Sequence, residues 1–179
     1  MNDRLKLAVD FAIEAHGDQR RKYSGRPYVE HPIAVARMVS RFEHDEDMLV
    51  AALLHDTAED TAVTLADVGS AFGYNVAMFV SDLTDVSLAT DGNRKSRKQR
   101  DLSHSAMAHP KAKTIKLMDL VHNTVSIVRN DLTFARVFLM EKEALLEVLW
   151  DASDPRAYAL AKRIYARGLD RLRVASTRR

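Results

Sequence analysis

A histidine and an aspartate, His55 and Asp56, stand side by side at the end of an apolar run that covers residues 48–54. Such a run predicts a helix that is buried on most sides. Burying an imidazole and a carboxylate is costly unless both find partners. A metal ion would satisfy both groups at once. Two further side chains, His31 in a loop-like stretch and Asp119 on a later apolar segment, could complete the site, so the sequence predicts four ligands for one divalent ion.

Acidic and polar neighbours accompany these four residues at helical spacing. Residues three and four apart share a helix face, so His55 and Glu59 face the same way, and Asp56 leans toward both Glu59 and Asp60. Around Asp119, an otherwise apolar helix carries one polar stripe, which predicts that this face lines a solvated pocket. The members of the stripe are Lys116, Asp119, His122, Asn123 and Ser126.

The ligand types indicate the chemistry. Imidazole and carboxylate groups without sulfur suit Mn²⁺, Fe²⁺ or Zn²⁺, and such an ion activates water and neutralises charge on a phosphate. Glu59 or Asp60 is placed to orient or deprotonate that water. We therefore predict a metal-dependent phosphohydrolase, in which His122 hydrogen-bonds a ligand rather than binding the ion. The alternative is a set of buried polar residues that satisfy one another.

Composition places few limits on this prediction. The 179 residues are 46% hydrophobic and 29% charged, which is typical of a globular protein and favours one domain over residues 1–179. The chain has no cysteine, which excludes disulfides and thiolate ligands. We expect a cytoplasmic protein, since no signal peptide or membrane-spanning run is apparent. A net charge of +2 is too small to argue for nucleic acid by itself.

The periodicity of apolar residues predicts an all-α fold. Thr64, with Asp67 three residues on, is predicted to cap one helix, and Asp91 to cap another. His31 precedes a proline and is expected to be extended, whereas Trp150 is expected in the core. The predicted helices beyond the first cover residues 33–42, 65–72, 75–86, 94–108, 110–128, 133–150 and 155–174, with one more ending at His55 and Asp56.

Three segments carry a resemblance to a known family. The order His31, His55-Asp56 and Asp119 resembles the metal signature of the HD-domain phosphohydrolases, and residues 19–32, 51–60 and 115–123 resemble the motifs of the RelA/SpoT hydrolase domain. The resemblance implies an all-α HD-domain helical bundle. Because the chain leaves no room for a synthetase domain, it is most similar to the stand-alone small alarmone hydrolases.

The resemblance also implies an activity and a set of roles. The family removes the 3′-diphosphate of ppGpp or pppGpp with Mn²⁺, giving GDP or GTP and pyrophosphate, so the implied partner is a nucleotide alarmone. By position, the metal ligands are His31, His55, Asp56 and Asp119, and Glu59 and Asp60 act on the attacking water. The implied substrate contacts are Arg21, Lys22, Asn123 and Ser126, of which Ser126 stands where relatives often carry threonine.

Departures from the family pattern keep other substrates open. Leu120 replaces a common arginine, Thr124-Val125 replaces a common Met-Arg pair, and Met140 lies near a position where some relatives carry an aromatic residue. An adenosine alarmone, (p)ppApp, is therefore one alternative. The others are a phosphomonoester such as the 2′-phosphate of NADPH, and a silent module that binds an alarmone or RNA without turnover.

The basic run at residues 94–100 invites a nucleic-acid interpretation. A solvated helix face is favoured because no aromatic residues interleave with the cations. A further option is that Lys98 reaches over the pocket to a phosphate.

Overall fold

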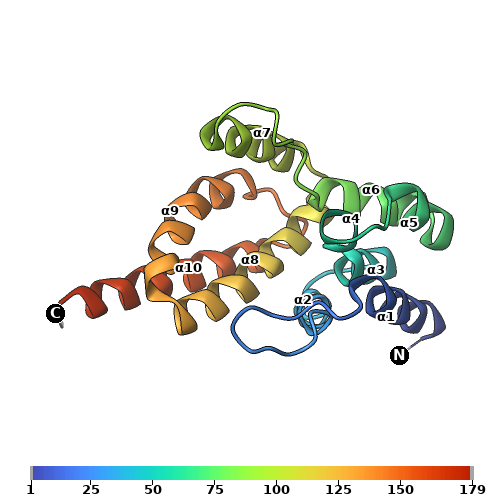
Figure 1. Ribbon diagram of the computed structural model, residues 1–179, viewed down its shortest axis with the longest axis horizontal. Coiled ribbons are helices and arrows are strands. Elements are labelled where there is room, and N and C mark those ends of the chain that lie inside the picture. The colour runs from blue at the N-terminus through green and yellow to red at the C-terminus, as the bar shows by residue number, and fades with distance from the viewer. Residues whose placement is uncertain (1, 178–179) are drawn as a thin grey trace.

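The computed structural model describes residues 2–177, and these residues form ten helices joined by loops (Figure 1). Their only β-type pairing is an isolated bridge between Arg20 and Pro27, so the predicted all-α class is confirmed. The helices are α1 (Asp3–His16), α2 (Glu30–Val39), α3 (Glu46–Leu54), α4 (Thr57–Asp60), α5 (Leu65–Phe72), α6 (Tyr74–Leu83), α7 (Arg94–Met107), α8 (Pro110–Asn130), α9 (Leu132–Val148) and α10 (Pro155–Thr177). None of the helices within this described part is long and apolar enough to cross a membrane.

Helix α8 is the central element of the fold. It packs against α2, α3 and α6 on the N-terminal side of the chain and against α9 and α10 on the C-terminal side, as Figure 1 shows. Apolar residues on most of its circumference are buried, including Ile115, Leu117 and Met118. The polar stripe that contains Asp119 is therefore held in a fixed orientation by core packing on the other faces of the same helix.

Helix α3 carries the His55-Asp56 pair at its C-terminal end. Asp45 begins the helix by accepting a hydrogen bond from Met48 N at 2.9 Å, and residues 50–54 are all buried. The regular helix ends at Leu54, and the chain bends at His55 and Asp56 before the short helix α4. The bend is fixed by Thr57, whose Oγ1 donates to Leu54 O at 2.7 Å.

The long connection between α1 and α2 runs alongside α8 and leads directly into His31. The expectation that His31 is extended is wrong, because α2 begins at Glu30 and His31 N donates to Tyr28 O at 2.8 Å. Pro32 allows this because the first N–H groups of a helix have no intrahelical partner, so a proline in the first turn costs no hydrogen bond. His31 is consequently fixed by a helix rather than by a loop.

Three predicted local features can be compared with the structure, and one is confirmed while two are corrected. Thr64 and Asp67 form the predicted capping box, with Asp67 N donating to Thr64 Oγ1 and Thr64 N donating to Asp67 Oδ2. Asp91 does not cap α7, because Asn93 takes that position and accepts from Ser96 N. Trp150 is 68% exposed rather than buried, since it follows the end of α9 at a turn and not on the packed face of that helix.

A buried carboxylate fixes the start of α10. Asp154 accepts hydrogen bonds from Glu43 N at 2.9 Å, from Arg156 N at 2.8 Å and from the Arg156 guanidinium. The guanidinium of Arg156 outweighs the effect of burial and holds the pKa of Asp154 well below its usual value. The contribution of Asp154 to stability is therefore present above the unfolded-state pKa of about 4 and is lost as the pH falls toward the lower folded-state pKa.

Replacing Asp154 with asparagine is expected to lower the free energy of unfolding at pH 7 by about 1–3 kcal/mol, the usual cost of losing hydrogen bonds to a buried charged group. Urea unfolding at pH 7 and pH 3 measures this. The difference in the free energy of unfolding between wild type and variant should be smaller at pH 3 than at pH 7. An equal difference at both pH values would show that the Asp154 carboxylate does not have a lowered pKa in the folded protein.

Candidate active site

The structure brings together all four side chains predicted to bind a metal. His31 Nε2 lies 3.4 Å from Asp56 Oδ2 and 3.1 Å from Asp119 Oδ1. His55 Nε2 lies 3.1 Å from Asp56 Oδ2 and 3.7 Å from Asp119 Oδ1. The residues come from α2, from the α3–α4 bend and from α8, and His31, His55 and Asp56 form a group that could hold a metal ion.

The orientation of His55 fits a metal ligand. Its Nδ1 lies 2.9 Å from Ala52 O and therefore donates to that carbonyl, so a neutral His55 ring would carry its lone pair on Nε2. Nε2 is buried and has no hydrogen-bond partner among residues 2–177. Leaving a buried polar atom without a partner is costly, so this atom, aimed at two carboxylates, is the observation that best supports a bound cation.

The charges at the site also favour a bound cation. Burial disfavours an ionised Asp119, but His31 and His55 outweigh it and hold the pKa of Asp119 well below its usual value. Burial would also raise the pKa of Asp56, which His55 instead lowers to about 2. Burial disfavours a charged His55, yet Asp56 and Asp119 raise its pKa well above the usual value. Two ionised carboxylates therefore draw positive charge onto this cluster, and a divalent ion meets that demand without protonating the histidines.

Neighbouring side chains fix the orientation of each candidate ligand. His122 contacts the candidate ligand His31, and the two Nδ1 atoms lie 2.8 Å apart, within hydrogen-bond distance. Burial, with the nearby His31 and Arg21, lowers the pKa of His122 to about 4, so the ring is neutral at pH 7. Asn123 Nδ2 donates to Asp119 Oδ1 at 2.6 Å. Such outer contacts set the rotamers and basicity of metal ligands.

Tyr28 is a positioning residue that sequence reasoning missed. Its hydroxyl donates to Asp56 Oδ2 at 2.7 Å, and its ring lies between His16, at 4.7 Å between centroids, and the guanidinium of Arg21, at 5.5 Å. The signal that could have found it is its place in the segment of residues 19–32, where a half-buried tyrosine needs a hydroxyl partner.

Replacing Tyr28 with phenylalanine should weaken metal binding by about 10- to 100-fold, the usual effect of removing an outer contact to a ligand. Titration of the metal-free protein with Mn²⁺ in a calorimeter measures this. Tyr74→Phe is the matched control because Tyr74 is 80% exposed on α6. Equal affinities for the two variants would show that Tyr28 does not position Asp56.

The two acidic residues predicted to act on water, Glu59 and Asp60, are exposed and lie three and four residues after Asp56. Glu59 remains accessible, and Asp85 N donates to its Oε2 at 3.3 Å. Partial burial of the carboxyl and the charge of Asp85 raise the pKa of Glu59 above its usual value. Asp60 is exposed and accepts from Gln19 Nε2 at 3.5 Å. Both residues stand on α4, directly after Asp56.

The four predicted substrate contacts share one cavity of about 250 Å³, lined by Arg21, Lys22, Asn123 and Ser126. Arg21 Nη2 donates to Asn123 Oδ1 at 3.2 Å. Aromatic rings line the same cavity, and Lys22 Nζ lies 5.2 Å from the Tyr23 ring centroid and 5.3 Å from that of Phe134. Cations beside aromatic faces suit a ligand that has both phosphates and a base.

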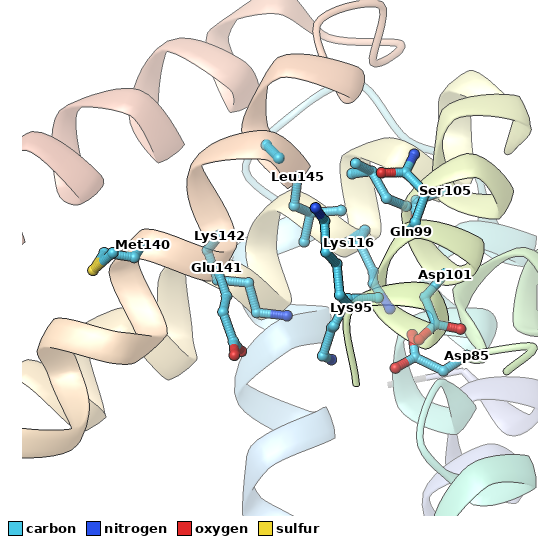
Figure 2. Close-up of a pocket in the computed structure, with 13 residues that line it drawn as sticks. Asp85, Lys95, Gln99, Asp101, Ser105, Lys116, Met140, Glu141, Lys142 and Leu145 are labelled. Atoms are coloured by element: carbon cyan, nitrogen blue, oxygen red, sulfur yellow. The ribbon is translucent and has the colours of Figure 1, made fainter. Parts of the chain in front are cut away.

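A second, larger cavity of about 470 Å³ was not predicted from the sequence. Figure 2 shows its walls, which come from α7, α8 and α9 and include Lys116, one turn before Asp119. The candidate metal cluster therefore has a cavity toward each end of the α8 stripe, because Asn123 and Ser126 line the smaller one and Lys116 the larger one.

Comparisons with known proteins agree with this fold. The sequence family described as the HD domain matches residues 8–137 of this chain. The guanosine-3′,5′-bis(diphosphate) 3′-pyrophosphohydrolases MESH1 of Mus musculus and Homo sapiens are each 42% identical over 122 residues, which is 66% of this chain and 66% of each relative. A solved structure described as a metazoan orthologue of SpoT that hydrolyses ppGpp superposes with a TM-score of 0.82 at 27% identity, covering 93% of this chain and 96% of the other.

The fold, the cluster and these matches define the class: the chain belongs to the HD-domain family. The match spans about two thirds of the length of the MESH1 relatives.

Proposed function

We propose that this protein is a metal-dependent 3′-pyrophosphohydrolase of guanosine alarmones, which converts ppGpp to GDP and pyrophosphate and pppGpp to GTP and pyrophosphate. The observation that carries the proposal is the cluster of two imidazoles and two carboxylates around His55 Nε2, a buried atom that has no hydrogen-bond partner within residues 2–177. The names of the MESH1 relatives supply the substrate class. We place the reaction in the cytoplasm, a reducing compartment that a chain without cysteine suits.

We assign the metal to Mn²⁺, with His31, His55, Asp56 and Asp119 as its protein ligands. A divalent ion bound there would supply a Lewis acid for the scissile phosphate and would acidify the attacking water. The protein's own contribution is to hold the ligands in place through His122, Asn123 and Tyr28.

We assign Glu59 as the general base and Asp60 as the residue that orients the water. Glu59 Oε1 or Oε2 would accept the proton of the water that attacks the phosphorus attached to the ribose 3′-oxygen. The bond from that phosphorus to the 3′-oxygen then breaks, and the oxygen leaves with a proton as the 3′-hydroxyl. The raised pKa of Glu59 brings its basicity closer to neutral pH, as general-base catalysis requires.

We place the nucleoside in the cavity lined by Arg21, Lys22, Asn123 and Ser126. The rings of Tyr23, Tyr28 and Phe134 line the same space and can contact a base. The guanidinium of Arg21 and the ammonium of Lys22 can neutralise phosphate charge there. In this position the ribose would lie next to Asn123, which also contacts Asp119.

The proposal is tested by incubating the purified protein with Mn²⁺ and each of ppGpp, ppApp and NADPH, and separating the products by ion-exchange chromatography. We expect GDP and pyrophosphate from ppGpp. Pyrophosphate from ppApp alone would assign the adenosine alarmone instead. Orthophosphate from NADPH alone would assign a phosphomonoesterase, and no product from any substrate would contradict the proposal.

A further inference from the structure

The cavity of about 470 Å³ is rich in lysine. Lys95 and Lys98 approach it from α7, Lys116 from α8 and Lys142 from α9, and Figure 2 shows Lys95, Lys116 and Lys142 on its walls. Four ammonium groups from three helices therefore share one concave space. Like charges repel at short range, so this arrangement costs free energy unless an anion enters the space.

Lys142 is less exposed than Lys95 and Lys98 on the wall of the same cavity. It is half-buried, and the aromatic ring of Phe138 lies 5.8 Å from its Nζ. Burial lowers the pKa of Lys142, as do the charges of Lys116 and Lys98, while Asp119 and Asp85 act in the opposite direction. Lys116 donates one hydrogen bond to Leu83 O at 2.6 Å, and an ammonium has three N–H groups, so it keeps donors for a further acceptor.

The carboxylates that line the cavity do not neutralise these lysines. Asp101 is occupied by Val86 N, Ser87 N and Ser87 Oγ. Glu141 is paired with Arg94, whose Nη2 lies 2.5 Å from Glu141 Oε1. Asp85 is the remaining acid on the wall. The cavity therefore presents more positive than negative charge to a ligand.

The cavity also adjoins the candidate metal cluster. Lys116 precedes Asp119 by three residues on α8, a rise of about 4.5 Å along the helix axis. Asp85, which also lines the cavity, donates its backbone N–H to Glu59. In the proposed binding mode, the scissile phosphorus lies at the cluster and the nucleoside lies in the smaller cavity, which Arg21 lines. The next phosphate of the substrate can then reach the lysine-rich cavity.

We propose that the lysine cavity binds a phosphate group of the substrate beyond the scissile phosphorus, through the ammonium groups of Lys116 and Lys142. The inference rests on the proposed function and makes Lys142 a determinant of substrate specificity. The phosphate can come from two places in an alarmone, the outer position of the 3′-diphosphate or the 5′-diphosphate. Both present the same dianionic chemistry to the lysines.

The test compares wild type with Lys142→Met, which keeps the length of the side chain and removes its charge. Lys162→Met is the matched control because Lys162 is exposed on α10, outside the walls of the cavity. Hydrolysis is measured for ppGpp, for the analogue that lacks the outer 5′-phosphate and for the analogue that lacks the outer 3′-phosphate. We expect Lys142→Met to reduce kcat/KM for ppGpp by about 10- to 100-fold, the effect of losing a hydrogen bond to a charged group, and Lys142→Arg to restore most of it.

The two analogues identify the phosphate. If Lys142→Met and wild type have equal kcat/KM for the analogue without the outer 3′-phosphate, Lys142 contacts the departing diphosphate. If they have equal kcat/KM for the analogue without the outer 5′-phosphate, Lys142 contacts the 5′-diphosphate. Equal kcat/KM for Lys142→Met and wild type on all three substrates would overturn the inference while leaving the proposed function intact.

Binding of inorganic pyrophosphate supplies a readout that does not depend on turnover. Calorimetry should show at least tenfold weaker binding to Lys142→Met than to wild type or Lys162→Met. If the wild type hydrolyses no alarmone, the proposed function fails, and the pyrophosphate titration still decides the inference: equal affinities overturn it. Should Lys142→Met lose its helical circular dichroism, Lys142→Gln takes its place in both measurements.

Discussion

Replacing Asp119 with asparagine is expected to lower kcat/KM for ppGpp by about 10³-fold or more and to abolish stoichiometric Mn²⁺ binding, because a metal centre supplies several kcal/mol of transition-state stabilisation. The substitution keeps the size of the side chain and removes the charge. Because His31 and His55 hold the pKa of Asp119 well below its usual value, the wild-type carboxylate is ionised throughout the working pH range. Product chromatography and metal analysis of the purified variant measure the two effects.

Asp10→Asn is the matched control for this substitution. Asp10 is exposed on α1 and pairs with Lys6, so its replacement should leave both activity and metal content unchanged. If the Asp119→Asn protein binds one equivalent of Mn²⁺ and hydrolyses ppGpp at the wild-type rate, Asp119 is not a metal ligand.

Replacing Glu59 with glutamine should separate metal binding from proton transfer. Glu59 stands beside the cluster but outside the four proposed ligands, so we expect normal Mn²⁺ content. Removal of a general base typically costs 10²- to 10⁴-fold in rate, and kcat for ppGpp should fall by about that factor. Single-turnover kinetics with the metal-loaded variant measure the chemical step directly.

Glu14→Gln on α1 is the control for Glu59→Gln, because Glu14 is exposed and its replacement changes the net charge by the same amount. If Glu59→Gln and Glu14→Gln turn over ppGpp at the same rate, Glu59 is not the base, and the same experiment on Asp60→Asn would then identify the residue that acts on water.

The parts of the site that could be predicted are those whose signal is local. His55 and Asp56 end an apolar run, and Asp119 lies on a polar stripe of an apolar helix, so burial by itself singles them out. The same reasoning gave the wrong conformation for His31. A residue before proline is usually extended, but here the first turn of α2 includes both residues and packs beside α8.

The contacts that could not be predicted depend on tertiary packing. Tyr28 meets Asp56 across a separation of 28 residues. Its place in the segment of residues 19–32 predicts that its hydroxyl needs a partner, but the sequence does not indicate that the partner is Asp56. Lys142 lies on α9 between Glu141 and Glu143, and a run of charged residues is typical of a solvated helix face. Its role emerges only because α7 and α9 pack together over the end of the α8 stripe that carries Lys116.

The central claim is that His31, His55, Asp56 and Asp119 jointly hold one divalent ion. Anomalous diffraction from crystals grown with Mn²⁺, recorded at the manganese absorption edge, tests it most directly. The account predicts one strong anomalous peak in contact with the two Nε2 atoms and the two carboxylates. Crystals that diffract well and show no peak among these four side chains would contradict it.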